Sequence, residues 1–308
     1  MSASPKLIFI VGVGRSGTSL LQSMVGAHPA IAVSPETHFL RHYLLDQKGY
    51  GRVSTLGGPE LLAKLSVDEE FLRAGVDPTD ILPQGEPVNL SAAYLRLASE
   101  LARRAGAEAY CDKDPNLVDY LPALHAHFPK AYVIHLYRDP RDVVLSKTKA
   151  KWSRGRPYWL HALIGEAQLQ RGLKHGPALF ADRWISLRYE ALLENPGDVL
   201  SDLCRRLDLP YATQMLTFQE TARDLVTERE LSWKKETFKP LMRQNRAKWR
   251  TKLSTRQVAL IEQLSPTFFR ELGYERNAAE NALIGAALLP ARPAFRQLYG
   301  WLRRNHTP

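Results

Sequence analysis

Eight residues near the start of the sequence, Gly12 to Ser19, combine glycines, hydroxyl side chains and one arginine, Arg15. Glycines let the backbone turn tightly with its N–H groups pointing inward, and a helix that starts at the turn adds a partial positive charge. Such a loop binds a phosphate. The related motif GxxxxGK[ST] has lysine where this sequence has Thr18, so a triphosphate would lack its main cation here. We therefore expect a shorter anion, with Arg15 near its terminal group.

A second group of polar residues runs from Arg138 to Ser146, which lies eight positions later. This spacing puts Ser146 about two turns into a predicted helix. The guanidinium group and the hydroxyl can then close on one phosphate, with the arginine as a charge-assisted donor. By itself, Arg138 could instead form a local ion pair with Asp139. Together with the glycine loop, the motif predicts two separate anion sites.

Both motifs follow runs that are typical of buried parallel strands, Lys6–Gly12 and Ala131–Tyr137. A helical pattern comes after each motif. Three shorter strands are predicted at Ile31–Val33, Ala109–Asp112 and Trp184–Arg188. The alternation of strands and helices predicts an α/β fold, a P-loop-like parallel sheet flanked by helices.

The rest of the chain is predicted to be mainly helical. Residues 47–107 indicate a helical insertion that covers the active site, and the C-terminal part is helical too. Ser34, Pro35 and Glu36 have the pattern of a helix start, with Ser34 as the cap. Another helix is expected from Tyr189 to about Leu207. Because the composition does not shift sharply anywhere, we expect residues 1–308 to form a single domain.

The composition is that of a folded enzyme with a basic balance. The 308 residues include 42 Lys and Arg against 32 Asp and Glu, a net charge of +10. This excess suits a phosphorylated nucleotide, a nucleic acid or an acidic membrane surface. Two distant cysteines, Cys111 and Cys204, make neither a disulfide framework nor a metal site. No signal peptide and no apolar run of about 20 residues is visible, so we expect a cytoplasmic enzyme.

The loop GVGRSGTSLLQSM, which directly follows LIFIV, resembles the 5′-phosphosulfate loop of sulfotransferases that use 3′-phosphoadenosine 5′-phosphosulfate (PAPS). It is nearest to the branch with a PRSGTT-type loop, which includes protein-tyrosine sulfotransferases. RDPRDVVLS fits the segment that holds the 3′-phosphate in that family. The resemblance extends from Lys6 to about Leu253. It implies transfer of a sulfonate group from PAPS to an acceptor hydroxyl, with no metal ion.

The resemblance also implies which residues bind the donor. Tyr189, in YEALLENP, would lie near the nucleotide, although a packed aromatic ring at a helix start has the same pattern. Lys239 would come over the nucleotide from a late loop, although it could equally be a surface charge. The full predicted set is Arg15, Ser16, Gly17, Thr18, Ser19, Arg138, Ser146, Tyr189 and Lys239.

Three residues are predicted to carry the chemistry. Glu36, in SPET, matches the EET-type segment that supplies the general base in the protein-tyrosine branch. His38 is its rival, since cytosolic small-molecule sulfotransferases use histidine and an imidazole suits the task. Lys113, in DKDP, would meet the leaving oxygen, unless it only pairs with a neighbouring aspartate. Arg15 would share the sulfonate and the 5′-phosphate.

Two other functions are open on the residues alone. One is a P-loop kinase or NTPase, against which Thr18 and the lack of a strand ending in a Mg²⁺-binding aspartate both argue. The other is a basic nucleic-acid-binding protein, although no recognition motif of the usual types appears. Nothing in the sequence identifies the acceptor. A peptide tyrosine, a carbohydrate, a lipid and a small natural product all fit.

Overall fold

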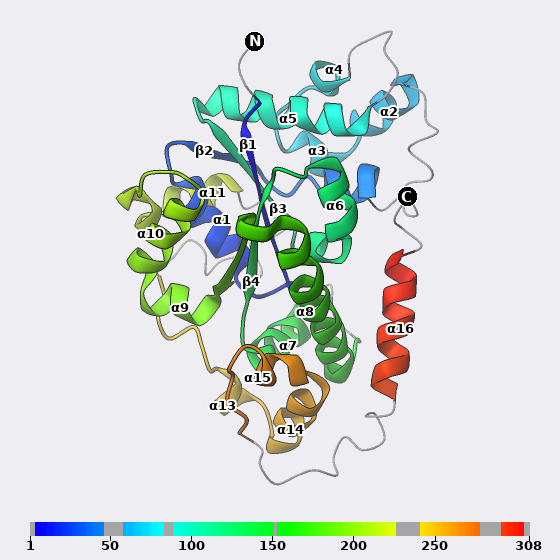
Figure 1. Cartoon of the computed structure of the whole chain (residues 1–308), viewed down its shortest axis with the longest axis vertical. Helices are drawn as coiled ribbons and strands as arrows, with labels where there is room; N and C mark the ends of the chain where they lie inside the picture. Colours follow the sequence, from blue (N-terminus) through cyan, green and yellow to red (C-terminus); the bar gives the residue numbers. More distant parts are fainter. Residues whose placement is uncertain are drawn as a thin grey trace.

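A computed structural model describes residues 4–45, 58–82, 89–150, 153, 155–225, 241–277 and 291–304. Within this part of the chain, five strands form one parallel sheet in the order β2-β3-β1-β4-β5 (Figure 1). The strands are β1 (Lys6–Gly12), β2 (Ile31–Val33), β3 (Ala109–Lys113), β4 (Tyr132–Tyr137) and β5 (Trp184–Arg188). The predicted P-loop-like sheet flanked by helices is confirmed.

Strand β1 lies at the centre of the sheet, paired with β3 on one side and β4 on the other. Its Ile10 stands opposite both Lys113 and Ile134. Because all five strands run the same way, their carboxyl ends meet at one edge of the sheet. This is the edge at which ligands bind in open α/β folds, and both polar motifs follow strands that end there.

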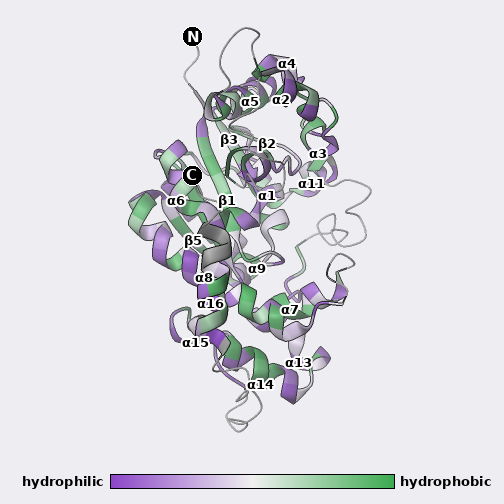
Figure 2. Ribbon diagram, turned by 90° about the vertical axis from the view of Figure 1, so that its right-hand side faces the viewer, coloured by the Kyte–Doolittle hydropathy of each residue, from purple (hydrophilic) through white to green (hydrophobic). Residues whose placement is uncertain are grey.

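The core lies on both faces of the sheet, since side chains alternate along a strand. Leu7, Phe9 and Val11 of β1 join a buried cluster with α5 (Leu90–Ala105) and α6 (Leu121–His127). Ile8 and Ile10 join the opposite cluster with α1 (Thr18–Gly26) and α10 (Pro196–Arg206). The continuous apolar run of β1 is therefore explained by burial on both sides (Figure 2).

The remaining described elements are helical. Before β3 lie η1 (Leu40–Leu45, a π-helix), α2 (Gly58–Leu65), α3 (Glu69–Leu72) and α4 (Pro78–Ile81). The later ones are η3 (Pro115–Tyr120), α7 (Pro140–Lys149), α8 (Tyr158–Phe180), η5 (Ala181–Arg183), α9 (Tyr189–Glu194), η6 (Thr213–Leu216), α11 (Gln219–Leu225), α13 (Trp249–Lys252), α14 (Thr255–Leu264), α15 (Pro266–Arg270) and α16 (Ala291–Arg304). None of the helices in the described ranges is both long and apolar enough to cross a membrane.

Two predicted elements differ from the structure. The helix start at Ser34 is wrong, because residues 34–38 are irregular and the Ser34 hydroxyl shares a hydrogen bond of 2.8 Å with the Tyr110 hydroxyl. The helix expected from Tyr189 is two helices, α9 and α10. Pro196 begins α10 at its first position, where the missing N–H of proline is tolerated.

Candidate functional site

The glycine loop has two positions that only glycine fits. Gly12 has φ of 149°, and a Cβ atom there would lie 2.3 Å from the carbonyl oxygen of Leu136. Gly17 has φ of 97° and precedes α1, and its Cβ would lie 2.3 Å from a ring carbon of Tyr189. The loop therefore lies against β4 on one side and against Tyr189 on the other. This contact brings Tyr189 to the loop.

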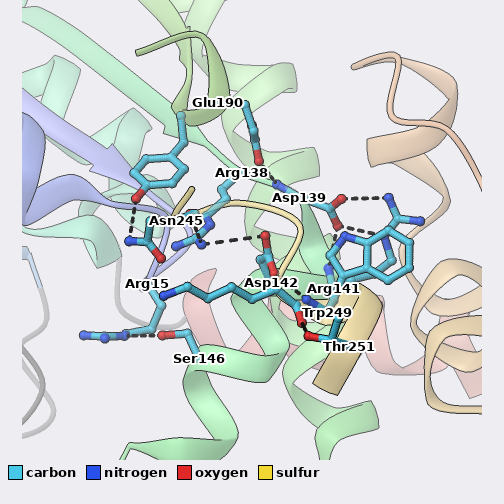
Figure 3. A network of polar contacts seen from close by, with 12 residues as sticks. Arg15, Arg138, Asp139, Arg141, Asp142, Ser146, Glu190, Asn245, Trp249 and Thr251 are labelled. Atoms are coloured by element: carbon cyan, nitrogen blue, oxygen red, sulfur yellow. Dashed lines mark hydrogen bonds and ion pairs between the residues drawn. The ribbon is translucent and has the colours of Figure 1, made fainter. Parts of the chain in front are cut away.

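Arg15 joins the two motifs of the sequence. Its Nε donates a hydrogen bond of 3.0 Å to the hydroxyl of Ser146 on α7 (Figure 3). The backbone of Arg15 has φ of 77°, in the left-handed region that non-glycine residues seldom adopt. The loop conformation thus turns the guanidinium group toward α7. The hydroxyl of Ser16, beside it, is buried and has no hydrogen-bond partner among the described residues.

Arg138 is buried at the end of β4. Its Nη2 donates to the backbone oxygen of Asn245 at 2.9 Å and lies 3.7 Å from a carboxylate oxygen of Asp142. The guanidinium carbon lies 4.3 Å from the centre of the Tyr189 ring, a cation–π contact. Its Nε is buried with no hydrogen-bond partner in the described part of the chain. One N–H of a buried cation is thus available to a further acceptor.

The alternative ion pair between Arg138 and Asp139 does not form. The Asp139 carboxylate caps α7 by accepting from the backbone N–H of Arg141 at 2.9 Å, and it pairs with the Arg141 guanidinium at 2.7 Å. Arg141 also reaches Glu262 at 2.6 Å and lies 3.8 Å from the centre of the Trp249 ring. These buried contacts hold the start of α7 against the C-terminal helices (Figure 3).

The late segment contributes a residue that the sequence did not reveal. Asn245 donates from its amide nitrogen to the Tyr189 hydroxyl at 3.0 Å, and its backbone accepts from Arg138. The predicted donor from this segment, Lys239, lies outside the described residues. A late loop over the site was expected, but no pattern singled out Asn245, which lies in a stretch rich in basic residues.

Two of the three predicted catalytic residues, Glu36 and Lys113, lie together at the end of β3. The Nζ of Lys113 contacts Oε1 of Glu36 closely and lies 3.4 Å from the hydroxyl of Ser19, at the start of α1. The Lys113 side chain is 1 % exposed and that of Glu36 is 17 % exposed. Lys113 therefore connects the glycine loop to the candidate base.

His38 also lies in this group, and two residues of the chain hold it there. Its Nδ1 lies 2.8 Å from Oδ2 of Asp114, which also accepts from Arg41 at 2.8 Å. Burial acts to raise the pKa of Asp114, but the charges of Arg41 and His38 outweigh it and keep that pKa well below its usual range. Neighbouring Asp112 has no such partners, and burial raises its pKa to about 6. Neither Asp114 nor Arg41 was predicted.

A cavity of about 520 Å³ opens beside these residues. It is lined by His42, Tyr43, Lys64, Val67, Asp68, Glu69 and Glu70. Oε2 of Glu70 lies 4.0 Å from Nε2 of His38, so the cavity adjoins the histidine that neighbours Glu36. Its walls come from η1, α2 and α3, within or next to the predicted insertion.

The parallel sheet, the glycine loop and the buried arginine at neighbouring strand ends define a P-loop-like α/β protein. Residues 5–213 match the model of the sulfotransferase family. The chain belongs to that family, as the loop and the RDPRDVVLS segment predicted.

Individual relatives agree with this assignment. A putative protein-tyrosine sulfotransferase of Caenorhabditis briggsae is 26 % identical over 227 residues, which cover 71 % of this chain and 71 % of that protein. Protein-tyrosine sulfotransferase 1 of Danio rerio is 28 % identical over 229 residues, 70 % of this chain and 56 % of that protein. The chain spans only 31 % of a relative from Aquifex aeolicus (strain VF5).

Among solved structures, the sulfotransferase domain of the olefin synthase of Synechococcus PCC 7002 has the same fold. It superimposes with a TM-score of 0.60 at 23 % sequence identity, over 89 % of this chain and 97 % of that domain. The shared fold includes the parallel sheet and the helices that flank it.

Proposed function

We propose that the protein transfers a sulfonate group from PAPS to an acceptor hydroxyl. The observation that carries the proposal is the contact between Arg15 of the glycine loop and Ser146 of α7, at 3.0 Å. It brings together the loop suited to a 5′-phosphosulfate and the helix suited to a 3′-phosphate. Membership of the sulfotransferase family supports the same reaction.

The residues present fit such a donor. The buried Ser16 hydroxyl and the buried Nε of Arg138 have no hydrogen-bond partner among the described residues. Buried polar groups are normally paired, so two orphaned donors at one edge of the sheet favour a polar ligand. Arg15, Ser16, Gly17, Thr18 and Ser19 would hold the 5′ end. Arg138 and Ser146 would hold the 3′-phosphate, with Tyr189 beside the nucleotide and Lys239 as a further candidate.

Glu36 and Lys113 divide the chemistry in this proposal. Glu36 would take the proton of the acceptor hydroxyl. Lys113 would stabilise the charge that builds on the leaving oxygen, because its Nζ lies between Glu36 and the hydroxyl of Ser19. Fixed cations and N–H groups aimed at developing charge lower the barrier without reorganisation. Arg15 would hold the sulfonate in line, and no metal ion is required.

Glu36 is preferred to His38 as the base. Its carboxylate is tied by Lys113 to the glycine loop, where the sulfonate would lie. His38 is instead fastened at Nδ1 to Asp114, and its Nε2 lies 3.8 Å from Oε2 of Glu36. His38 thus stands behind Glu36 relative to the loop.

The acceptor would enter through the 520 Å³ cavity beside Glu36 and His38. This gives the predicted insertion, residues 47–107, its role in shaping the acceptor site, since α2 and α3 line that cavity. The names of two relatives as protein-tyrosine sulfotransferases support a peptide tyrosine as the first acceptor to try. A carbohydrate, a lipid or a small natural product follows.

We also place the protein in the cytoplasm and treat residues 1–308 as one domain. Cys111 and Cys204 are both buried free thiols, which suits a reducing compartment. One sheet with helices on both faces supports a single unit. Limited proteolysis that released two stably folded fragments would contradict the single domain.

The direct test is transfer of ³⁵S from labelled PAPS to a panel of acceptors in EDTA, beside a separate assay of ATP and GTP hydrolysis in Mg²⁺ without EDTA. We expect label in one acceptor class and no Mg²⁺-dependent hydrolysis of ATP or GTP. Hydrolysis of a nucleoside triphosphate without any ³⁵S transfer would contradict the proposal and favour the NTPase alternative. Tight, salt-sensitive binding of DNA with no affinity for the donor would favour the nucleic-acid-binding alternative.

A further inference from the structure

One histidine in the site has carboxylates on both ring nitrogens. Nδ1 of His38 lies 2.8 Å from Asp114, and Nε2 lies 3.8 Å from Oε2 of Glu36 and 4.0 Å from Oε2 of Glu70. The short contact at Nδ1 fixes the ring and leaves Nε2 as the nitrogen that can exchange a proton. The two longer contacts are within reach of a small side-chain rotation or a bridging water.

The backbone of His38 is strained in a way that maintains this arrangement. Its φ is 50°, in the left-handed region that non-glycine residues seldom adopt. The carbonyl of His38 accepts from the N–H of His42 at 2.9 Å, directly before η1. Strain of this kind persists where the surrounding structure requires it, so the direction of the ring is set by the fold.

Among these four side chains, that of Glu70 is the most exposed. Asp114 is 4 % exposed, His38 16 %, Glu36 17 % and Glu70 41 %. Glu70 also lines the cavity, whereas Lys113 on the other side of Glu36 is 1 % exposed. A proton on Glu36 can therefore reach the water of the cavity through His38 and Glu70. On the other side of Glu36, the buried Lys113 offers no such path.

We propose that His38 passes the proton that Glu36 takes from the acceptor on to Glu70, which releases it to water in the cavity. This inference rests on the proposed function. The acceptor oxygen gives its proton to Oε2 of Glu36. His38 starts as the imidazolium ion and gives its Nε2 proton to Oε2 of Glu70, and Nε2 then takes the proton from Oε2 of Glu36. Glu36 is left as a carboxylate again, ready for the next acceptor, and His38 returns to its starting charge.

The charges around His38 suit a relay that starts protonated. Asp114, Glu36 and Glu70 face the ring from three different segments, while Arg41 and His42 on η1 oppose them and Asp112 lies further into the strand. Burial lowers the pKa of His38, but Asp114 and Glu36 outweigh it and raise the pKa overall. Burial lowers the pKa of His42 to about 4, so that ring is neutral at pH 7. The imidazolium ion gives its Nε2 proton to Glu70 and then accepts one from Glu36.

A relay that restores the base has a kinetic signature. It affects later turnovers and leaves the first one unchanged. In Glu70→Gln, single-turnover transfer of ³⁵S from PAPS should match the wild type. Steady-state turnover should fall by roughly tenfold, a modest part of the contribution of acid–base catalysis. Added imidazole buffer should restore it by carrying the proton instead. The acceptor is a tyrosine-containing peptide, or water in PAPS hydrolysis if the peptide is not labelled.

His38→Gly is the second variant, because glycine tolerates the positive φ and leaves space for free imidazole. Its steady-state rate should fall and be rescued by imidazole. Asp80→Asn on α4 removes an exposed carboxylate elsewhere in the insertion and should change nothing. A first turnover that slows as much as the steady state, or a Glu70→Gln rate equal to wild type, would overturn the relay. A wild type that releases no ³⁵S with any acceptor contradicts the proposed function instead.

Discussion

The donor side of the site is held by buried ion pairs at the start of α7, whereas the acceptor side lies on an irregular segment. On the donor side, Arg141 is fixed between Asp139 and Glu262, and Arg138 is packed on Tyr189. The acceptor side comprises residues 34–38, η1, α3 and Asp114, which caps η3. Four titratable groups there, Glu36, His38, Glu70 and Asp114, lie within about 4 Å of a neighbour in the group.

The two sides differ because one would bind the donor and the other would move a proton. A phosphorylated donor is bound by cations and N–H groups that keep a fixed charge and position, and a rigid framework supplies them. A proton can move only between groups whose charges change, and those groups must be adjacent and partly open to water. We therefore expect mutations on the donor side to change stability and donor affinity, and mutations on the acceptor side to change turnover.

The largest effect is expected on the acceptor side. Glu36→Gln keeps the shape of the side chain and removes its basicity, so turnover should fall by roughly 10²–10⁴-fold while donor affinity stays close to normal. Steady-state ³⁵S transfer and calorimetry of the donor product measure the two quantities. His38→Gly should lower turnover less. If His38→Gly were the more severe variant and Glu36→Gln mild, the base would be His38.

Removal of Arg141 from the donor side should destabilise the folded protein. Arg141→Ala leaves the carboxylates of Asp139 and Glu262 buried without their cation, which typically costs about 3–5 kcal/mol. Urea unfolding at pH 7 measures the loss. Arg250→Ala is the matched control, because Arg250 contacts the same Trp249 ring from the exposed side. Equal stability of the two variants would mean that the ion pairs do not hold α7.

Arg138 should matter more for donor affinity than for the stability of the fold. Arg138→Ala removes a charge-assisted donor to the 3′-phosphate and should weaken binding of 3′-phosphoadenosine 5′-phosphate (PAP) by about 1.5–3 kcal/mol. Calorimetry measures the affinity, with a melting curve for the protein without ligand. Arg205→Ala removes an exposed arginine of α10 and should leave binding unchanged. Unchanged affinity in Arg138→Ala would make Arg138 a structural residue.

The smallest effect is expected at Lys147, a buried lysine next to Ser146. Burial lowers its pKa from 10.5 to about 8. Its charge therefore opposes folding below pH 8, and the penalty disappears as the pH rises from 8 to 10.5. Lys147→Met should stabilise the protein by about 1–2 kcal/mol at pH 7, less than the full shift implies because attraction to Asp119 is lost too. The gain over wild type should vanish near pH 10.5.

The donor side of the site could be predicted from local patterns in the sequence. Strand β1, the glycine loop and the start of α7 follow from local patterns, since the turn needs Gly12 and Gly17 and the strands are buried on both faces. The family assignment from these two motifs is confirmed, while the roles of the individual residues and the single domain stay predictions.

The acceptor side gave no such local signal. Ser34 has the pattern of a helix cap, but its hydroxyl is bound by Tyr110 from the neighbouring strand. Asp114 becomes the shared partner of His38 and Arg41 only because β2 and β3 are adjacent, and its contact with Arg41 spans 73 positions in the chain. Asn245 reaches Tyr189 across 56 positions of the chain. Contacts of this kind depend on tertiary structure, which a pattern of neighbouring residues does not encode.

We propose above that the two motifs bind the two phosphates of one nucleotide. Calorimetry of the wild-type protein with PAP and with AMP, both in EDTA, tests it most directly. We expect PAP to bind more tightly than AMP by about 1.5–3 kcal/mol, because only PAP carries the phosphate that Arg138 and Ser146 would hold. Equal affinity for PAP and AMP would contradict the account.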